Sequence, residues 1–218
     1  MTATFIIPLW ADLLAIGIGS VQGAMFAAQF RDRRLDLLGV AIIGISTGFG
    51  GGILRDVLLA QVPAALTSNW YLIVATAAAL TGMLLERLIS RLGPLVTVLD
   101  ALTIGLFGAI GTTKALSAGL PEVPAVFVGV LTAVGGSILR DLLLNRPIAL
   151  MHVGSLYAIA AVVGCTSLAI MLDLEVPVFL AATLCVVLTS GVRILAVAFN
   201  WTLPEQRAIA SMPRIRRR

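Results

Sequence analysis

Apolar residues along this chain gather in seven long segments that are separated by short polar or charged connections. A helix needs about 20 apolar residues to cross the hydrocarbon core of a bilayer. Seven segments reach roughly that length, at residues 8–28, 37–60, 69–89, 95–117, 123–144, 153–172 and 177–199. The pattern therefore predicts an all-α membrane protein with seven transmembrane helices.

The composition agrees with this pattern, because 59% of the 218 residues are hydrophobic, 12% are charged, and the mean hydropathy is +1.05. Soluble domains carry about twice that share of charge. The net charge of +4 could indicate a nucleic-acid partner. The basic residues instead fall between the apolar segments and in the tail at 214–218, so we expect membrane lipids and no nucleic acid as partners.

Lys and Arg in the connections predict the orientation, because cytoplasmic loops carry the excess of positive charge. The arginines in alternate connections and in the tail are Arg31, Arg33, Arg34, Arg87, Arg91, Arg146, Arg207, Arg214, Arg216, Arg217 and Arg218. The other connections carry none, and no cleavable signal precedes the first segment. We expect a multi-pass protein of a prokaryotic cell (inner) membrane, with its N-terminus outside and its C-terminus in the cytoplasm.

One motif occurs twice in the chain. Residues Gly50–Asp56 return 85 positions later as Gly135–Asp141, and Asp12–Gly17 resembles Asp100–Gly105. Further matches join Pro63 to Pro147 and Tyr71 to Tyr157. Each unit holds three spans, an odd number, so the second unit must enter the membrane upside down. The sequence therefore predicts an inverted repeat, an arrangement common in transporters and channels.

This repeat divides the chain into four parts. Residues 1–90 form the first three-helix repeat and residues 91–175 the second, inverted one. Residues 176–200 supply the seventh transmembrane helix, and residues 201–218 form a basic cytoplasmic tail.

The glycine runs lie in the middle of this repeat. Gly50, Gly51 and Gly52 are consecutive, whereas Gly135 and Gly136 are followed by Ser137. Small residues can serve close helix packing alone. Consecutive glycines also weaken a helix, by about 1 kcal/mol each. We expect a kink or a break at both runs, beside a polar cavity that satisfies any freed backbone groups.

The four charged residues after these runs, Arg55, Asp56, Arg140 and Asp141, lie within apolar segments, where charges are costly. Arg140 could reach the interface, but Arg55 lies toward the outer end and needs a partner or an aqueous path. Because neighbouring helical residues point about 100° apart, we expect each aspartate to pair with another helix rather than with its own arginine. Lys114 and Arg193 are the other candidate cations for Asp56 and Asp141.

Asp12 and Asp100 stand at equivalent places near the starts of the first and fourth segments. They either complement a helix N-terminus or form a cation-attracting pore mouth on each side. Lys114 is either an interfacial residue or a voltage-responsive element, and its counterpart in the first repeat is Phe26.

Residues suited to enzyme chemistry are scarce. His152 is the single histidine, and Cys165 and Cys185 lack metal-ligand spacing. We expect no catalytic residues, metal site or cofactor.

The doubled glycine, arginine and aspartate motif in a seven-span chain resembles the prokaryotic TRIC (trimeric intracellular cation) channel family, over almost the whole sequence from Asp12 to about Asn200. The resemblance implies a homotrimer in which each protomer holds its own pore for monovalent cations, chiefly potassium. It places the bends of the second and fifth helices at Gly50–Gly52 and at Gly135–Gly136, with Ser137 in place of the third glycine. The Arg-Asp pairs would lie in or beside the path.

Related bacterial sequences are also labelled as glycine-transporter domains. A secondary transporter for a small solute such as an amino acid is therefore the alternative function, and a scaffold whose glycines serve only packing is a third. Ser46, Thr47, Thr132 and Ser137 near the glycine runs favour a wet cation path.

Overall fold

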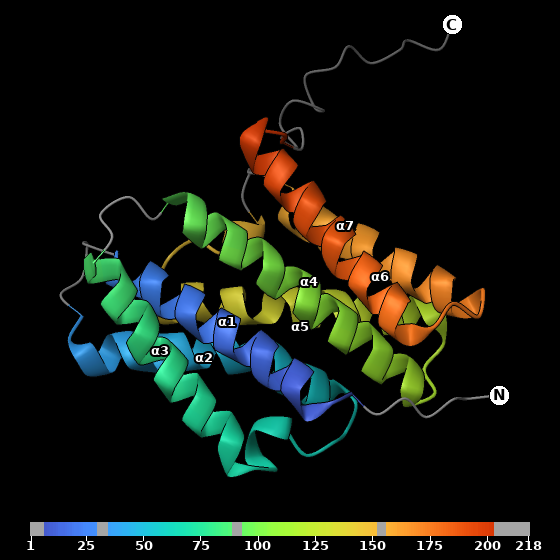
Figure 1. Cartoon of the computed structure of the whole chain (residues 1–218), viewed down its shortest axis with the longest axis horizontal. Coiled ribbons are helices and arrows are strands. Elements are labelled where there is room, and N and C mark those ends of the chain that lie inside the picture. Colours follow the sequence, from blue (N-terminus) through green and yellow to red (C-terminus); the bar gives the residue numbers. More distant parts are fainter. Residues whose placement is uncertain (1–6, 30–34, 89–92, 152–155, 203–218) are drawn as a thin grey trace, which may run out of the picture.

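A computed structural model describes residues 7–29, 35–88, 93–151 and 156–202 of the chain. These residues form seven α-helices and two short 3-10 helices, joined by turns and short connections (Figure 1). The first repeat holds α1 (Leu9–Ala28), α2 (Leu37–Leu58), η1 (Ala64–Leu66) and α3 (Asn69–Leu88). The second repeat holds α4 (Gly93–Ser117), α5 (Glu122–Leu143), η2 (Ala149–Met151) and α6 (Tyr157–Asp173), and α7 (Val178–Ala198) follows. The predicted all-helical fold with seven helices is confirmed.

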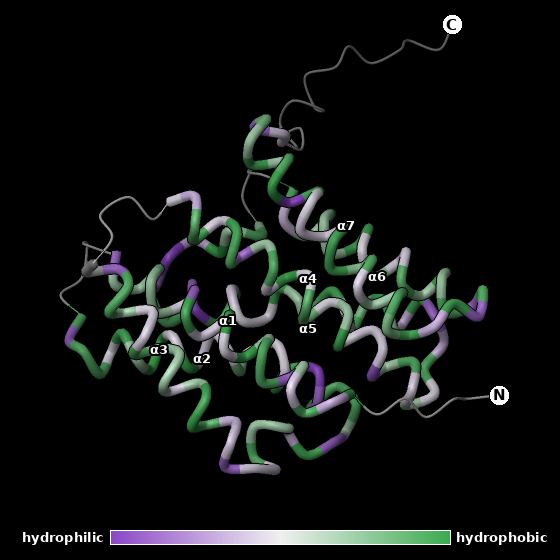
Figure 2. Tube along the Cα trace, in the orientation of Figure 1, coloured by the Kyte–Doolittle hydropathy of each residue, from purple (hydrophilic) through white to green (hydrophobic). Residues whose placement is uncertain are grey.

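Six of these helices are long and apolar enough to cross a membrane, and apolar residues run along most of their length (Figure 2). The exception is α6, which has 17 residues. At 1.5 Å per residue it extends about 25 Å, somewhat less than the thickness of the hydrocarbon core. The expected sixth span began at residue 153, whereas the described helix begins at Tyr157.

The two central helices, α2 and α5, end with the same backbone geometry. Ala60 and Asn145, which are 85 residues apart, both adopt a left-handed backbone conformation, with φ of 52° and 51°. The next amide in each case, that of Gln61 or Arg146, donates to the carbonyl of Asp56 or Asp141 at 2.8 Å. This is the Schellman ending of a helix. Both repeats therefore stop their second helix in the same way, just after the charged pair.

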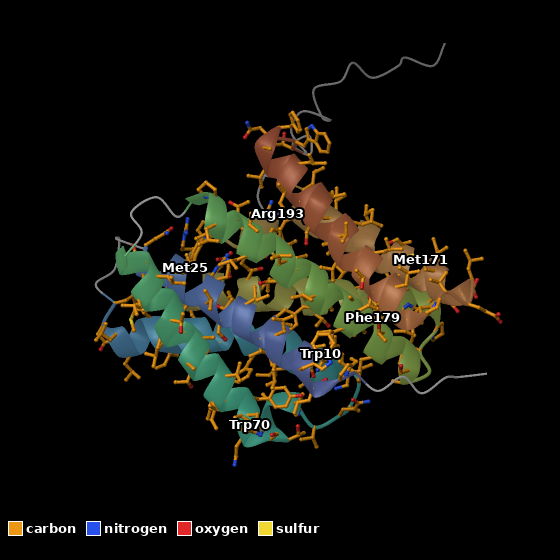
Figure 3. The ribbon with its side chains drawn as sticks, viewed as in Figure 1. Trp10, Met25, Trp70, Met171, Phe179 and Arg193 are labelled. Atoms are coloured by element: carbon orange, nitrogen blue, oxygen red, sulfur yellow. The ribbon has the colours of Figure 1, made fainter. Side chains whose placement is uncertain are left out.

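The two repeats meet along α2 and α5, which pack against each other in the middle of the molecule, while α3 lies on one side and α6 and α7 on the other (Figure 1). Within the first repeat α1 packs on both α2 and α3. Within the second, α4 packs on α5, and α7 covers α4 and α6. Large apolar side chains point outward, among them Trp70 and Phe179 (Figure 3). This placement is that of a lipid-facing surface.

The glycine runs form the crossing of α2 and α5. A methyl group on Gly50 would lie 3.0 Å from the Cα of Gly136, and one on Gly135 would lie 3.1 Å from the Cα of Gly51. A methyl group on Gly51 would meet the carbonyl oxygen of Thr132, so only a hydrogen fits there. Such contacts let Cα–H groups approach carbonyl oxygens, a weak attraction that recurs at helix interfaces.

Both helices remain helical through these runs. Of the expected kink or break, the break is therefore excluded, because contact across the crossing and the intact hydrogen bonds of each helix outweigh the low helix propensity of glycine. A bend within the continuous helices stays a prediction. The hydroxyls of Thr47 and Thr132 are buried here and donate to the carbonyls of Ile43 and Val128 in their own helices, at 2.7 and 2.6 Å.

Candidate functional site

Two buried clusters of charged and polar residues flank this crossing, each centred on the Arg-Asp pair of one repeat. The first cluster consists of Asp12, Arg55, Asp56, Tyr71 and Lys114. The second cluster consists of Gln22, Phe26, Asp100, Arg140, Asp141, Arg146, Tyr157 and Arg193. Since α2 and α5 run antiparallel and each Arg-Asp pair follows its own glycine run, the clusters lie on opposite sides of the crossing.

In the first cluster, Asp56 is the centre of the charged network. Arg55 Nε donates to Asp56 Oδ1 at 2.7 Å, and Lys114 Nζ of α4 lies 2.8 Å from the same oxygen. The amide of Ala64, at the start of η1, donates to Asp56 Oδ2 at 2.7 Å. The side chains of Arg55 and Asp56 are 1% and 0% exposed, so these contacts replace water as their solvation.

Asp12 extends this network into α1 and α3. Its carboxylate lies 3.6 Å from Arg55 Nη1 and accepts a 3.2 Å hydrogen bond from the hydroxyl of Tyr71. Arg55 thus links two aspartates, and the charges run without a gap from Asp12 to Lys114.

The second cluster repeats the Arg-Asp pair of the first. Arg140 Nη2 lies 2.9 Å from Asp141 Oδ1, and the amide of Ala149, at the start of η2, donates to Asp141 Oδ2 at 3.0 Å. Arg140 is only 4% exposed. The interpretation that Arg140 reaches out to the interface is therefore wrong.

Asp100 is the second carboxylate of this cluster. It accepts hydrogen bonds from the Tyr157 hydroxyl at 3.1 Å and from Gln22 Nε2 at 3.3 Å. Its charged partner is Arg193 of α7, at 3.3 Å, which also stacks over the ring of Tyr157. The helix outside the repeat thus completes the second cluster.

The expected pairing of the aspartates needs correction. Asp56 and Asp141 do pair with the preceding arginine, because a long arginine side chain can fold back although neighbouring helical residues point apart. Of the two other candidate cations, Lys114 does pair with Asp56. Arg193 pairs with Asp100 rather than with Asp141.

Asp12 and Asp100, which were expected to have the same role, differ in their place on the helix. Asp12 lies in the first turn of α1, where it complements the helix N-terminus, although Pro8 holds the capping position. Asp100 lies about two turns inside α4, which begins at Gly93, so helix capping is wrong for this residue. Both residues are 8% exposed, and each carboxylate accepts a hydrogen bond from a tyrosine hydroxyl on the third helix of its own repeat.

One difference between the clusters comes from a single position. Lys114 and Phe26 are equivalent, since each lies 14 residues after the aspartate of its repeat, Asp100 or Asp12. Where Lys114 reaches Asp56, the Phe26 ring instead lies under Arg140, 3.9 Å from its guanidinium carbon, and 5.2 Å from that of Arg146. Such stacking is a favourable cation–π contact.

The two clusters also differ in the space beside them. A cavity of about 290 Å³ is lined by every member of the second cluster, including Asp100, Arg140 and Arg193. The corresponding space beside Asp12, Arg55 and Asp56 is only about 10 Å³, no more than one water molecule needs. The second cluster therefore lies beside a much larger cavity than the first.

Sequence reasoning did not identify Gln22 as a site residue or foresee the contact between Phe26 and Arg140. A glutamine inside an apolar segment was an available signal for Gln22, whereas nothing in the sequence indicated the ring contact. His152 and all the connection and tail arginines except Arg87 and Arg146 lie outside the described residues. Among the described residues, no group of three or more His, Cys, Asp or Glu could hold a metal ion.

Comparison with known proteins agrees with this architecture. A family model described as glycine transporter matches the chain twice, at residues 9–87 and 97–173, which are the two repeats. The UPF0126 inner membrane protein YadS of Escherichia coli K12 is 31% identical over 198 residues, covering 89% of this chain and 94% of YadS. A UPF0126 membrane protein of Deinococcus radiodurans is 34% identical over 157 residues, covering 71% and 72%.

Solved structures match as well. One solved structure, described under the structural basis for conductance through TRIC cation channels, matches with a TM-score of 0.81 and 33% sequence identity. The match covers 92% of this chain and 98% of that one. The TRIC trimeric intracellular cation channel orthologue from Rhodobacter sphaeroides has the same TM-score with 26% identity, and the match covers 92% and 100%. The chain therefore belongs to the UPF0126, or glycine transporter, family of membrane proteins and has the fold of the prokaryotic TRIC cation channels.

Proposed function

We propose that this protein is a channel for monovalent cations, chiefly potassium, with a pore inside each protomer. The path runs from the second cluster, past the crossing of α2 and α5, to the first cluster. The observation that carries the proposal is the pair of buried, pseudo-symmetric ion clusters on the two sides of that crossing, one of them beside a polar cavity of about 290 Å³. The same fold in solved TRIC cation channels supports it.

Arginines beside a cation path would repel the ions unless their charge is neutralised. Arg55 and Arg140 are each held by the following aspartate, at 2.7 and 2.9 Å. Each aspartate is fixed in turn by a backbone amide of a 3-10 helix. The arginines therefore act as fixed, paired groups, and the carboxylates of Asp12 and Asp100 face the ions as pore mouths.

The glycine runs are the proposed narrow part of the pore. Gly50, Gly51 and Gly52 on α2 and Gly135, Gly136 and Ser137 on α5 bring the two backbones together. Two helices that meet without large side chains between them can move apart with little repacking. Opening is then a small movement of α2 away from α5, with water entering beside the freed Cα–H groups.

Lys114 is the proposed gate of the first-cluster end. Its ammonium joins α4 to Asp56 of α2, whose carboxylate lines the small space of about 10 Å³ at that end. Its side chain is 24% exposed, so it stands at the boundary between protein and surroundings. A charge that crosses the whole membrane field contributes about 2.3 kcal/mol per 100 mV, which makes a voltage-dependent release of Lys114 feasible.

Orientation and assembly follow from charge and from the relatives. The arginine bias places the first cluster toward the outside and the second toward the cytoplasm of a prokaryotic inner membrane. The TRIC relatives are described as trimeric, and we propose a homotrimer in which each protomer conducts by itself.

A second function, a carrier for a small amino acid, is favoured by the unequal cavities. One end of the path is open and the other closed, as alternating access requires, and the protein has the inverted repeat typical of such carriers. The open cavity offers guanidinium groups for a carboxylate and Asp100 for an ammonium group. The family model described as glycine transporter points the same way.

Recordings from purified protein in a planar bilayer with a KCl gradient separate the two functions. Discrete openings whose reversal potential follows the potassium gradient support the channel. If protein that is shown to be folded and inserted gives no openings at any voltage, and the same protein in liposomes takes up radiolabelled glycine with saturation, the carrier replaces it. Arg55→Ala and Asp56→Asn should both change flux, and a motif that is merely structural would leave the flux per folded protein unchanged.

A further inference from the structure

Phe26 and Lys114 are equivalent residues with opposite effects on the contact between the repeats. Both belong to the first helix of their repeat, and both reach the second helix of the other repeat. Lys114 brings a positive charge to an aspartate, whereas Phe26 brings an aromatic ring to an arginine.

At the first cluster, Lys114 adds a charge from α4 to the pair of Arg55 and Asp56. Asp56 Oδ1 receives both Arg55 and Lys114, and Arg55 also faces Asp12. Four charged residues from α1, α2 and α4 therefore form a row of alternating sign. The space beside Asp12, Arg55 and Asp56 is about 10 Å³.

At the second cluster Arg140 pairs with Asp141 and Arg193 pairs with Asp100, while Arg146 also lies over the Phe26 ring. The Phe26 ring covers the face of the Arg140 guanidinium, while the in-plane N–H groups of Arg140 point to Asp141 at 2.9 and 3.0 Å. Asp100 is bound by Arg193, on the α7 side. The cavity of about 290 Å³ is lined by both pairs.

We propose that Phe26 is a positioning residue that holds Arg140 on its ring and thereby keeps the second-cluster end of the path open to water. Lys114 at the equivalent place keeps the first-cluster end closed, so one unequal position sets which end is accessible at rest. The proposal rests on the path described under the proposed function, but it applies equally to a channel and to a carrier. The role assigned to Phe26, an apolar residue of α1, is to hold the Arg140 guanidinium in place beside the cavity.

Two equivalent alanines allow this to be measured without any ion or solute. Ala64 and Ala149 line the first and second cavities, and the amide of each donates to the aspartate of its cluster. Ala64→Cys and Ala149→Cys are made separately in a background that lacks Cys165 and Cys185, the two native, buried cysteines. Reaction rates with a charged, water-soluble thiol reagent are then compared in detergent, where both ends are reachable.

The substitutions of Phe26 are chosen to separate charge from shape. Phe26→Trp and Phe26→Tyr keep an aromatic face for Arg140, Phe26→Leu removes it, and ring-fluorinated phenylalanines weaken it in steps at nearly constant size. Phe127→Leu, on a residue of α5 that is 61% exposed, controls for the loss of a phenylalanine as such.

We expect the second-cluster cysteine to react at least tenfold faster than the first-cluster one in the parent. Phe26→Leu should reduce this ratio by roughly five- to thirtyfold, the factor that corresponds to one or two kcal/mol. The fluorinated series should reduce it in graded steps, while Phe26→Trp, Phe26→Tyr and Phe127→Leu leave it near the parent value.

A fluorinated series with a flat ratio would overturn the proposal, because those variants keep the shape of the side chain and differ mainly in its attraction for a cation. A parent ratio near one would overturn it too. If Phe26→Leu fails to fold, the fluorinated series decides alone. Loss of potassium current or of glycine uptake with an unchanged labelling pattern counts against the proposed function, not against the role of Phe26.

Discussion

Replacing Lys114 by methionine removes the ammonium group that ties α4 to Asp56 of α2, while a flexible apolar side chain keeps most of the volume. Lys114 Nζ lies 2.8 Å from Asp56 Oδ1. At an effective dielectric constant of about 20, two unit charges at that distance attract by roughly 6 kcal/mol. Dehydration of buried ions costs several kcal/mol, so the net contribution of the pair comes to about 2 kcal/mol, within the range for hydrogen bonds to charged groups.

If this pair holds the first-cluster end closed, its loss shifts the equilibrium toward the open state by a factor of roughly 30. Single-channel recording in planar bilayers measures the open probability directly. Lys114→Met should raise it at every voltage until it saturates, and the voltage dependence should become shallower. Lys114→Arg, which keeps the charge, serves as the matched control and should stay close to the parent.

A double-mutant cycle with Asp56→Asn tests the pair itself. Once Asp56 has lost its charge, adding Lys114→Met should change the open probability little further, because the two substitutions remove the same interaction. Equal open probabilities for the parent and Lys114→Met, or fully additive effects in the cycle, would refute the reasoning.

Two further predictions concern the crossing and the second cluster. Gly51→Ala places a methyl group against the carbonyl of Thr132 and should destabilise the fold by about 1–3 kcal/mol, seen as a lower melting temperature in detergent, whereas Gly93→Ala, with nothing within 4 Å, should not. Equal melting temperatures for the two variants would contradict the close contact. Asp141→Asn leaves the buried Arg140 without its carboxylate and should cost about 3–5 kcal/mol, seen as a reduced yield of monodisperse protein. A normal yield with normal flux would mean that Arg140 finds another partner.

The sequence alone specified the helices and the repeat. Hydropathy is a local property of the chain that extends over a whole helix. Six of the expected segments therefore form a long apolar helix, and the remaining one, at 153–172, forms the shorter α6. The doubled motif predicted the internal repeat, which the two matches of the family model confirm, and the odd number of spans predicted that its second unit is inverted. Residues in equivalent places, such as Tyr71 and Tyr157, do make equivalent contacts with Asp12 and Asp100.

The tertiary structure decided which charges pair and which cluster lies beside the larger cavity. The contacts of Lys114 with Asp56 and of Arg193 with Asp100 join residues 58 and 93 positions apart, and they depend on side-chain reach rather than on helix periodicity. The glycine runs were ambiguous for the same reason, since only the opposite helix shows that they are a contact surface. The sequence thus determines what each helix presents, while the partner of each buried charge depends on which helices pack against it.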